Sequence, residues 1–411
     1  MREAVTSIKG NARPLLLTEP IFAILITMYS GYMTLYMLEF GVSKAQVGMI
    51  TSLGLSVQLV FALVSAYLTD KMGRRYSTMV FDTISWVGAL IIWALAQNIW
   101  YFIAGAIVNG FSRVVMNSYY CLILEDSPPE SRIHIFNFLL AAGIIAGFFS
   151  PVGAFLVSKM TLVPAMRAMI FFSAAVFMAL LIIRNFFLTE TETGRQKMRE
   201  MKGVSLWGVF KSYLPVLRRV MANRLLVIAL LVRSLYFIQL TIRGTFLSVL
   251  VTERLGFPAE AMAVFYTFNS VVMLITLLFV TPVLARYTRR WPISMGLWIH
   301  ILAALTLLLS PPTGNYLLLI AAAILIALGA SIASPRIDTL VANAIENDDR
   351  SVANAITNVI LLLLTAPFGV IGGVLAGIDV RLPFLLIVAI FLICQALFRV
   401  ADQMEKKMEL R

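Results

Sequence analysis

Long apolar runs, separated by mostly short polar connections, make up almost the whole chain. Each run approaches the roughly 20 residues that a helix needs to cross the hydrocarbon core of a bilayer. The runs occupy residues 15–38, 45–67, 76–96, 100–123, 135–158, 165–187, 225–250, 261–284, 292–310, 315–343, 353–376 and 382–400. Outer-membrane barrels show instead segments of about ten residues with alternating polarity. The pattern therefore predicts an all-α integral membrane protein with twelve transmembrane helices.

Composition strengthens this prediction. Hydrophobic residues make up 60% of the chain and charged residues 13%, whereas soluble domains carry about 45–50% and about 25%. No Walker-type glycine-rich loop, metal-ligand spacing or nucleophile elbow occurs in the sequence. We therefore expect a protein that is not an enzyme, holds no cofactor or metal, and has the lipid bilayer as its solvent.

The net charge of +12 is distributed unevenly between the two sides of the runs. Most Lys and Arg residues lie on one side, and the other side carries only Lys44, Lys159, Arg167, Arg254 and Arg381. This bias is the positive-inside rule, which assigns the basic side to the cytoplasm. We therefore expect a multi-pass protein of the cytoplasmic (plasma) membrane with both termini cytoplasmic, and no nucleic-acid partner.

One long polar stretch divides the runs into six and six. We expect an N-terminal six-helix bundle over residues 1–187, a cytoplasmic linker over 188–224 and a C-terminal six-helix bundle over 225–411. Two such pseudo-symmetric bundles would enclose a central cavity. Apolar residues at Leu206–Phe210 interrupt the linker's polarity and indicate a helix on the inner membrane surface. We expect the protein to be a monomer.

A charged motif occupies the loop between the second and third runs. It reads Ala66-Tyr67-Leu68-Thr69-Asp70-Lys71-Met72-Gly73-Arg74-Arg75. Gly73 permits a sharp turn that other residues resist, and Asp70 can pair with Arg74 or Arg75 or cap a neighbouring helix. The equivalent loop of the second half carries a weaker copy, with Arg286, Arg289 and Arg290 at corresponding positions. A simpler alternative is a basic loop that only sets topology.

This motif resembles the signature of the major facilitator superfamily, with Ala66 in place of the usual first glycine. The resemblance implies two six-helix bundles and transport by alternating access. It also implies a gating loop formed by Asp70, Lys71, Gly73, Arg74 and Arg75. Two patterns of proton-coupled drug exporters are incomplete. Ala106 stands where many of them have an arginine in span four, and only part of their span-five glycine pattern is present.

Ionisable residues inside the apolar runs are costly unless they face a cavity or a partner. Arg113 lies about three helical turns before Glu125, which places it near the midplane of span four. Asn109, Asn117 and Tyr120 share its helical face. Arg336 has a comparable position in span ten. Arg113 could instead pair with Asp82, and Arg336 with Asp338.

Other polar residues in the runs complete a candidate substrate cavity. Spans seven, one and eight contribute Arg233, Tyr236, Gln239, Tyr29, Tyr32, Tyr36 and Asn269. Arg243 lies near the outer end of span seven, where its side chain can reach the surface. Guanidinium groups bind carboxylate and phosphate through charge-assisted hydrogen bonds, so the pattern favours a polar or anionic solute. The tyrosines could equally serve in helix packing.

Coupling of transport to an ion requires a group that changes charge. The candidate carboxylates are Asp82, Asp338 and Glu19. Coupling to protons is what the resemblance implies, and uniport or coupling to sodium are the alternatives. We therefore predict a secondary transporter that moves a small organic solute, polar or anionic, by alternating access. A proton-coupled multidrug efflux antiporter is the alternative. A sensor that kept the fold but does not transport is a third possibility.

Overall fold

The computed structural model describes residues 10–284, 291–344 and 350–409, and every regular element in these ranges is a helix. Within them, twelve helices are long and apolar enough to cross a membrane, which confirms the predicted number. These helices are Ala12–Ser30, Lys44–Met72, Arg74–Ala94, Ile99–Glu125, Glu130–Met160, Leu162–Phe187, Arg224–Arg254, Ala261–Leu284, Trp291–Leu309, Tyr316–Ala342, Ala355–Ile378 and Leu382–Val400.

The chain forms two compact units. The first comprises residues 1–41 and 53–211, and the second comprises residues 42–52 and 212–411. The first half of the chain contains α2 (Ala12–Ser30), α3 (Met33–Glu39), α4 (Lys44–Met72), α5 (Arg74–Asp82), α6 (Ala89–Ala94), α7 (Ile99–Asn109), α8 (Ser112–Glu125), α9 (Pro129–Ala146), α10 (Ser150–Met160), α11 (Leu162–Phe187) and α12 (Glu192–Glu200). Two helices contain residues of both units. The long helix α4 begins in the second unit and continues in the first from residue 53, and the later helix α13 (Leu206–Ala222) begins in the first unit and continues in the second from residue 212.

The second half of the chain follows from α13. It contains α14 (Arg224–Val249), α15 (Ala261–Ile275), α16 (Thr281–Leu284), α17 (Trp291–Leu309), α18 (Tyr316–Ala344), α19 (Arg350–Thr365), α20 (Pro367–Ile378) and α21 (Leu382–Glu409). Short irregular helical turns also occur at Thr83–Gly88, Gly147–Phe149, Leu250–Arg254 and Thr276–Val280. The sequence pattern did not predict these turns.

Polar side chains start several helices where the sequence provides a capping residue. The side chains of Asn98, Thr191 and Asn223 accept hydrogen bonds from backbone N–H groups in the first turns of α7, α12 and α14. Such caps satisfy backbone donors that have no partner inside the helix. α13 begins at Leu206, so the apolar stretch in the linker is helical as predicted.

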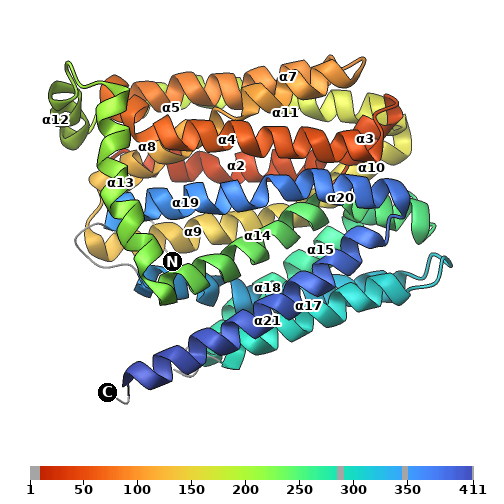
Figure 1. Cartoon of the computed structure of the whole chain (residues 1–411). Helices are drawn as coiled ribbons and strands as arrows, with labels where there is room; N and C mark the ends of the chain where they lie inside the picture. Colours follow the sequence, from red (N-terminus) through yellow and green to blue (C-terminus); the bar gives the residue numbers. More distant parts are fainter. Residues whose placement is uncertain (1–9, 285–290, 345–349, 410–411) are drawn as a thin grey trace. The chain divides into compact units, whose positions relative to one another are not determined.

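The first unit is organised around α2. This helix packs against α9, α10 and α11, while α5 packs against α8 (Figure 1). Gly153 lets α10 approach α2 closely, because a Cβ at that position would lie 2.2 Å from the Met28 carbonyl oxygen. The rings of Phe22 and Phe177 stack with their centroids 4.2 Å apart. These contacts fix α2 and α11 side by side.

In the second unit, the beginning of α4 packs tightly on α20. A Cβ on Gly48 would lie 2.3 Å from the Gly369 carbonyl oxygen, and one on Gly373 would lie 2.8 Å from the Gly48 Cα atom. The Ser52 hydroxyl donates to the Ala366 carbonyl and accepts from the Val370 N–H. Glycine is required here because the two backbones approach too closely for any side chain.

Candidate functional site

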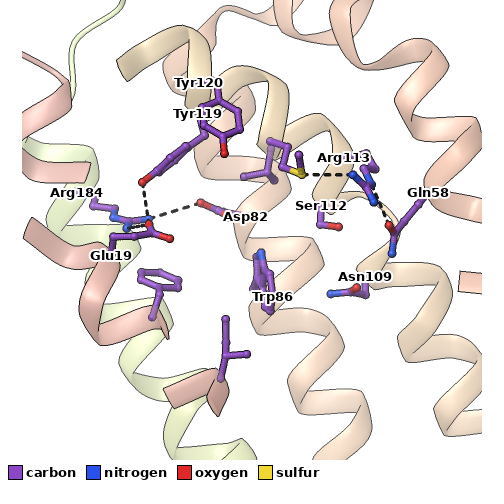
Figure 2. Close-up of a pocket in the computed structure, with 14 residues that line it drawn as sticks. Glu19, Gln58, Asp82, Trp86, Asn109, Ser112, Arg113, Tyr119, Tyr120 and Arg184 are labelled. Carbon is purple, nitrogen blue, oxygen red and sulfur yellow. Dashed lines mark hydrogen bonds and ion pairs between the residues drawn. The ribbon is translucent and has the colours of Figure 1, made fainter. Parts of the chain in front are cut away.

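A cavity of about 370 Å³ lies inside the first unit, between α2, α4, α5, the end of α7, α8 and α11. Its charged, amide and serine lining side chains are Glu19, Gln58, Asp82, Asn109, Ser112, Arg113 and Arg184. Phe22, Trp86, Tyr119 and Tyr120 supply aromatic walls. Figure 2 shows the charged residues in two groups on separate helices. The cavity is within the range of about 300–1,000 Å³ that is typical of small-molecule sites.

The first group is a charged cluster that we call the Arg184 cluster, formed by Arg184, Glu19, Asp82 and Tyr119 (Figure 2). The Arg184 guanidinium lies 3.5 Å from a Glu19 oxygen and 3.9 Å from an Asp82 oxygen. The Tyr119 hydroxyl donates to Glu19 at 2.8 Å. Asp82 is 4% exposed and Arg184 is 3% exposed, whereas the Glu19 side chain is 32% exposed. One guanidinium is thus shared by a buried carboxylate and a partly exposed one.

Packing holds Arg184 in place from several sides. Its Nε donates to the Thr18 hydroxyl, and its guanidinium carbon lies 4.3 Å from the centre of the Phe22 ring. Cation–π contact of this kind stabilises a guanidinium in a desolvated site. Thr18, Glu19 and Phe22 all belong to α2, so this one helix supplies most of the contacts that position Arg184 on α11.

Arg113 forms the second charged group. Its Nε donates to the Gln58 side-chain oxygen at 2.9 Å, and its Nη1 lies 3.5 Å from the Met116 sulfur (Figure 2). Among the described residues, no carboxylate lies within ion-pair distance of this guanidinium. Arginine remains charged in proteins. Arg113 therefore offers most of its donors to whatever occupies the cavity.

An irregular turn shapes the wall between these groups. α5 ends at Asp82, and a π-helical turn follows over Thr83–Gly88. Asn109 donates to the Ser85 carbonyl inside this turn at 3.0 Å, which ties the end of α7 to it. Trp86, from the same turn, lines the cavity. Turns of this type are rare and are often found at functional sites.

The structure changes the partners expected for some residues of the first half. Asp82 pairs with Arg184 and not with Arg113. Asn117 shares a helix with Arg113 but donates to the Thr69 hydroxyl at 3.1 Å and does not line the cavity. The expected aromatic stripe of span one is buried in helix packing and likewise does not line this cavity. Its members are Tyr29, Tyr32 and Tyr36, which are 4%, 1% and 0% exposed.

In the second unit, the predicted residues are dispersed. Asp338 pairs with Arg233 at 3.0 Å. Arg336, which the sequence offered as an alternative partner of Asp338, does not form this pair. Arg336 donates to the Ile332 carbonyl of its own helix at 3.0 Å. Asn269 donates to the Ala323 carbonyl at 3.3 Å. These contacts join α14 to α18 and α15 to α18.

Two further predicted residues of the second unit, Tyr236 and Gln239, are 5% and 1% exposed. The Tyr236 hydroxyl lies 3.3 Å from the His300 Nε2 atom, which connects α14 with α17. Both residues of α14 therefore lie inside the helix packing of this unit.

The charged loop after α4 forms a compact network. Gly73 has a φ of 87°, a conformation that glycine adopts without strain and that other residues rarely adopt. Arg74 lies 2.7 Å from Asp70 and 3.1 Å from Glu125. The Glu190 carboxylate accepts hydrogen bonds from the backbone N–H groups of Arg74 and Arg75, at 2.9 and 3.0 Å. The loop is therefore tied both to the end of α8 and to the chain that follows α11.

The remaining two side chains of the loop make separate contacts. Arg75 donates to the side-chain and backbone oxygens of Asn185, at 3.1 and 2.7 Å. Lys71 donates to the Tyr67 hydroxyl at 2.9 Å. The weaker copy of the motif, at Arg286, Arg289 and Arg290, lies outside the described residues.

Sequence reasoning missed Arg184, Tyr119, Gln58 and Glu190. Arg184 stands near the inner end of span six, where positive-inside counting treats it as a flanking charge. A usable signal exists, because Arg184 lies within the apolar run and precedes its last three residues. Gln58 was detectable as an amide in the middle of a long apolar run. No comparable signal marks Tyr119 or Glu190.

Comparison with known proteins places this fold. The sequence model of the Major Facilitator Superfamily matches residues 15–370 and 234–409. A stretch of 113 residues is 27% identical to the uncharacterized MFS-type transporter YqjV of Bacillus subtilis (strain 168), and it spans 27% of each of the two proteins.

Solved transporters share the fold over almost their full length. A variant of the nucleoside transporter NupG has a TM-score of 0.71 at 16% identity, covering 94% of this chain and 99% of that one. A bacterial homologue of the human lysosomal transporter Spinster, inward-facing and unoccupied, has a TM-score of 0.71 at 15% identity, covering 96% of both chains. A variant of the peptide transporter POT in complex with alafosfalin has a TM-score of 0.70 at 11% identity, covering 98% of both.

Proposed function

Because this chain belongs to the major facilitator superfamily and is therefore a secondary transporter and not an enzyme, we propose that it moves a small organic anion together with a proton. The observation that carries this proposal is Arg113, which lies on the wall of a 370 Å³ cavity and has no carboxylate partner among the described residues. Such a group binds carboxylate or phosphate through charge-assisted hydrogen bonds. The aromatic walls suit the organic part of the solute.

The charges that line the cavity balance before a solute binds. Glu19 and Asp82 contribute two negative charges, and Arg113 and Arg184 contribute two positive charges. A monoanion at Arg113 would leave one excess negative charge in a site of low dielectric constant, where such an excess is costly. Uptake of one proton restores neutrality. A lipophilic cation would leave one excess positive charge, and neither arginine can release a proton to offset it, so this lining disfavours the multidrug alternative.

The Arg184 cluster is the place where that proton binds. Two carboxylates that share one guanidinium cannot both be fully compensated, so one of them gains by accepting a proton. A metal cation would need several oxygen ligands close together, and the guanidinium between the carboxylates would repel it. Asp82 is the preferred acceptor, because Glu19 also accepts a hydrogen bond from Tyr119.

The mechanism that follows is alternating access, with the Asp70–Arg75 loop as an inner latch. Its ion pairs and backbone hydrogen bonds hold the inner ends of α4, α5, α8 and α11 together. These contacts would break and reform as the transporter changes conformation. The protein would act as a monomer in the cytoplasmic membrane with both termini in the cytoplasm.

Ligand-dependent thermal stability of the purified transporter tests the anion site. A ligand that binds the native state raises stability by about 2.7 kcal/mol at 100 times its Kd. We expect at least one small organic carboxylate or phosphate ester to raise the unfolding temperature of the wild type. Arg113→Gln should abolish this rise, and Arg195→Gln, on the exposed helix α12, should retain it. Stabilisation by lipophilic cations, or by anions equally in Arg113→Gln, would overturn the proposal.

A further inference from the structure

The helix α13 is not one of the twelve candidate spans, yet it exposes large apolar side chains. Trp207 is 68% exposed and Met221 is 56% exposed. On a span, such exposure is explained by the surrounding lipid. α13 instead lies between two spans in the chain, on the side that the positive-inside rule assigns to the cytoplasm. Its exposed apolar side chains therefore need an explanation of their own.

One face of α13 packs against the second unit. Val216 and Val220, one turn apart, are 6% and 4% exposed and belong to an apolar cluster. The other buried members of this cluster come from the ends of three neighbouring helices, namely Leu226, Ala229 and Leu230 of α14, Leu340 and Val341 of α18, and Ile356 of α19. α13 is thus held at the level where those helices leave the apolar core of the membrane.

The direction of α13 differs from that of the helices on which it packs. In Figure 1, α13 (green) runs across α14 and α19 of the same unit. Transmembrane helices are tilted on average only about 20° from the bilayer normal. A helix that crosses them at their ends lies along the plane of the bilayer, at its boundary with water.

The opposite face of α13 combines apolar and basic side chains. Trp207, Arg218 and Met221 are spaced by about three turns and then about one turn, so they share this face, and all three are exposed. Arg218 lies two positions beyond Val216, which places it on the side of the helix away from the packed cluster. In the described part of the chain, Arg218 forms no ion pair.

The charge of this helix is complementary to one kind of surface. α13 contains Lys211, Arg218 and Arg219 and no acidic residue, and Arg224 follows it directly. The cytoplasmic leaflet carries anionic lipids that attract such basic segments. Tryptophan is enriched at the membrane–water boundary, and an arginine beside it can keep its stem in apolar surroundings while its guanidinium reaches the headgroups.

From these contacts we propose that the face of α13 formed by Trp207, Arg218 and Met221 binds the anionic phospholipids of the cytoplasmic leaflet. The Trp207 and Met221 side chains enter the boundary layer, and the Arg218 guanidinium binds the negative headgroups through charge-assisted hydrogen bonds. The surface is continuous with the ends of spans that lipid already surrounds. α13 therefore fixes the connection between the two halves of the chain to the membrane.

The test is the environment of a nitroxide spin label attached at Met221→Cys, after Cys121 and Cys394 are replaced by serine. The full chain is placed in nanodiscs of phosphatidylcholine alone or of phosphatidylcholine mixed with phosphatidylglycerol. Paramagnetic resonance then compares the label's collisions with oxygen, which concentrates in hydrocarbon, and with a neutral nickel chelate, which stays in water. We expect a several-fold greater preference for oxygen in the anionic discs, and this difference should shrink at high salt.

Two charge variants carrying the same label show whether Arg218 is responsible. Arg218→Gln should weaken the association about fivefold, the equivalent of about 1 kcal/mol for one basic residue near an anionic lipid surface. Arg195→Gln removes an exposed arginine of α12 that pairs with Glu192. It is the matched control and should keep the full difference between the two kinds of disc.

A label that collides mainly with the nickel chelate in both discs would overturn the proposal, because this face would then point into water and be open to a soluble partner. An equal preference for oxygen in both discs would also overturn it, since apolar contact alone would hold the helix. A difference that survives unchanged in Arg218→Gln would place the recognition elsewhere. Solute binding at Arg113 is untouched in these variants, so the result is independent of the proposed transport function.

Discussion

At the scale of single residues, Asp82 and Glu19 differ although both face Arg184. Asp82 is 4% exposed and lies 3.9 Å from the guanidinium. Glu19 lies closer, at 3.5 Å, and also accepts a hydrogen bond from Tyr119. The carboxylate with fewer compensating contacts is the one that gains most from protonation. The two residues should therefore be separable by isosteric substitution.

Asp82→Asn should uncouple transport from the proton. In proteoliposomes, wild-type uptake driven by an inward proton gradient should fall as the external pH rises, because the proton is a co-substrate. The variant should bind the solute and exchange it across the membrane, but it should not accumulate it, and its exchange rate should be flat with pH. Gradient-driven accumulation that persists in both Asp82→Asn and Glu19→Gln would contradict the assignment.

The candidate residues were partly predictable at this scale. Arg113, Asn109, Asp82 and Glu19 stand out in sequence because charge and amide groups are rare inside apolar runs, and all four line the cavity. Their partners were not predictable. Which guanidinium Asp82 meets depends on how α5 and α11 pack side by side, and spacing along one helix carries no information about a neighbouring helix.

At the scale of helices, the start of α4 and α20 approach each other backbone to backbone. A Cβ at Gly373 would meet the Gly48 Cα and the backbone oxygens of Lys44 and Ala45 within 3.0 Å. Backbone atoms cannot rotate away as a flexible side chain can. The sequence shows the glycines but not which helix they contact, so this pairing had no predictor in the chain.

Gly373→Ala should therefore destabilise the protein by about 1–3 kcal/mol, the usual cost of overpacking, which lowers the unfolding temperature. Gly377→Ala is the matched control on the same helix, because nothing lies within 4 Å of a Cβ there. That variant should be neutral or slightly stabilised, since alanine favours helix over glycine by about 1 kcal/mol. Equal unfolding temperatures for the two variants would contradict the close contact.

At the scale of the whole molecule, the positive-inside bias predicts the orientation of every connection. The number and order of the spans followed directly from the apolar runs, because each crossing must satisfy its backbone hydrogen bonds within one helix. The apolar runs did not predict that residues 42–52 belong to the second unit while the rest of the same helix belongs to the first. A uniform apolar run gives no sign of where it changes partners.

Orientation can be checked by labelling single cysteines after Cys121 and Cys394 are replaced by serine. Gln97→Cys, in the exposed connection before α7, should react with a membrane-impermeant maleimide added to intact cells. Arg195→Cys, on α12, should react only after the membrane is opened. The reverse pattern would place the termini on the outside.

The hydrogen bonds from the backbone of Arg74 and Arg75 to Glu190 determine where the gene can be divided into two pieces. A break at residue 187 would put the charged loop on the first fragment and Glu190, which binds the backbone of that loop, on the second fragment. A break between Gly203 and Val204, beyond α12, keeps both carboxylate hydrogen bonds within one polypeptide. Co-expressed halves should therefore reassemble into a working transporter with the later break and poorly with the earlier one.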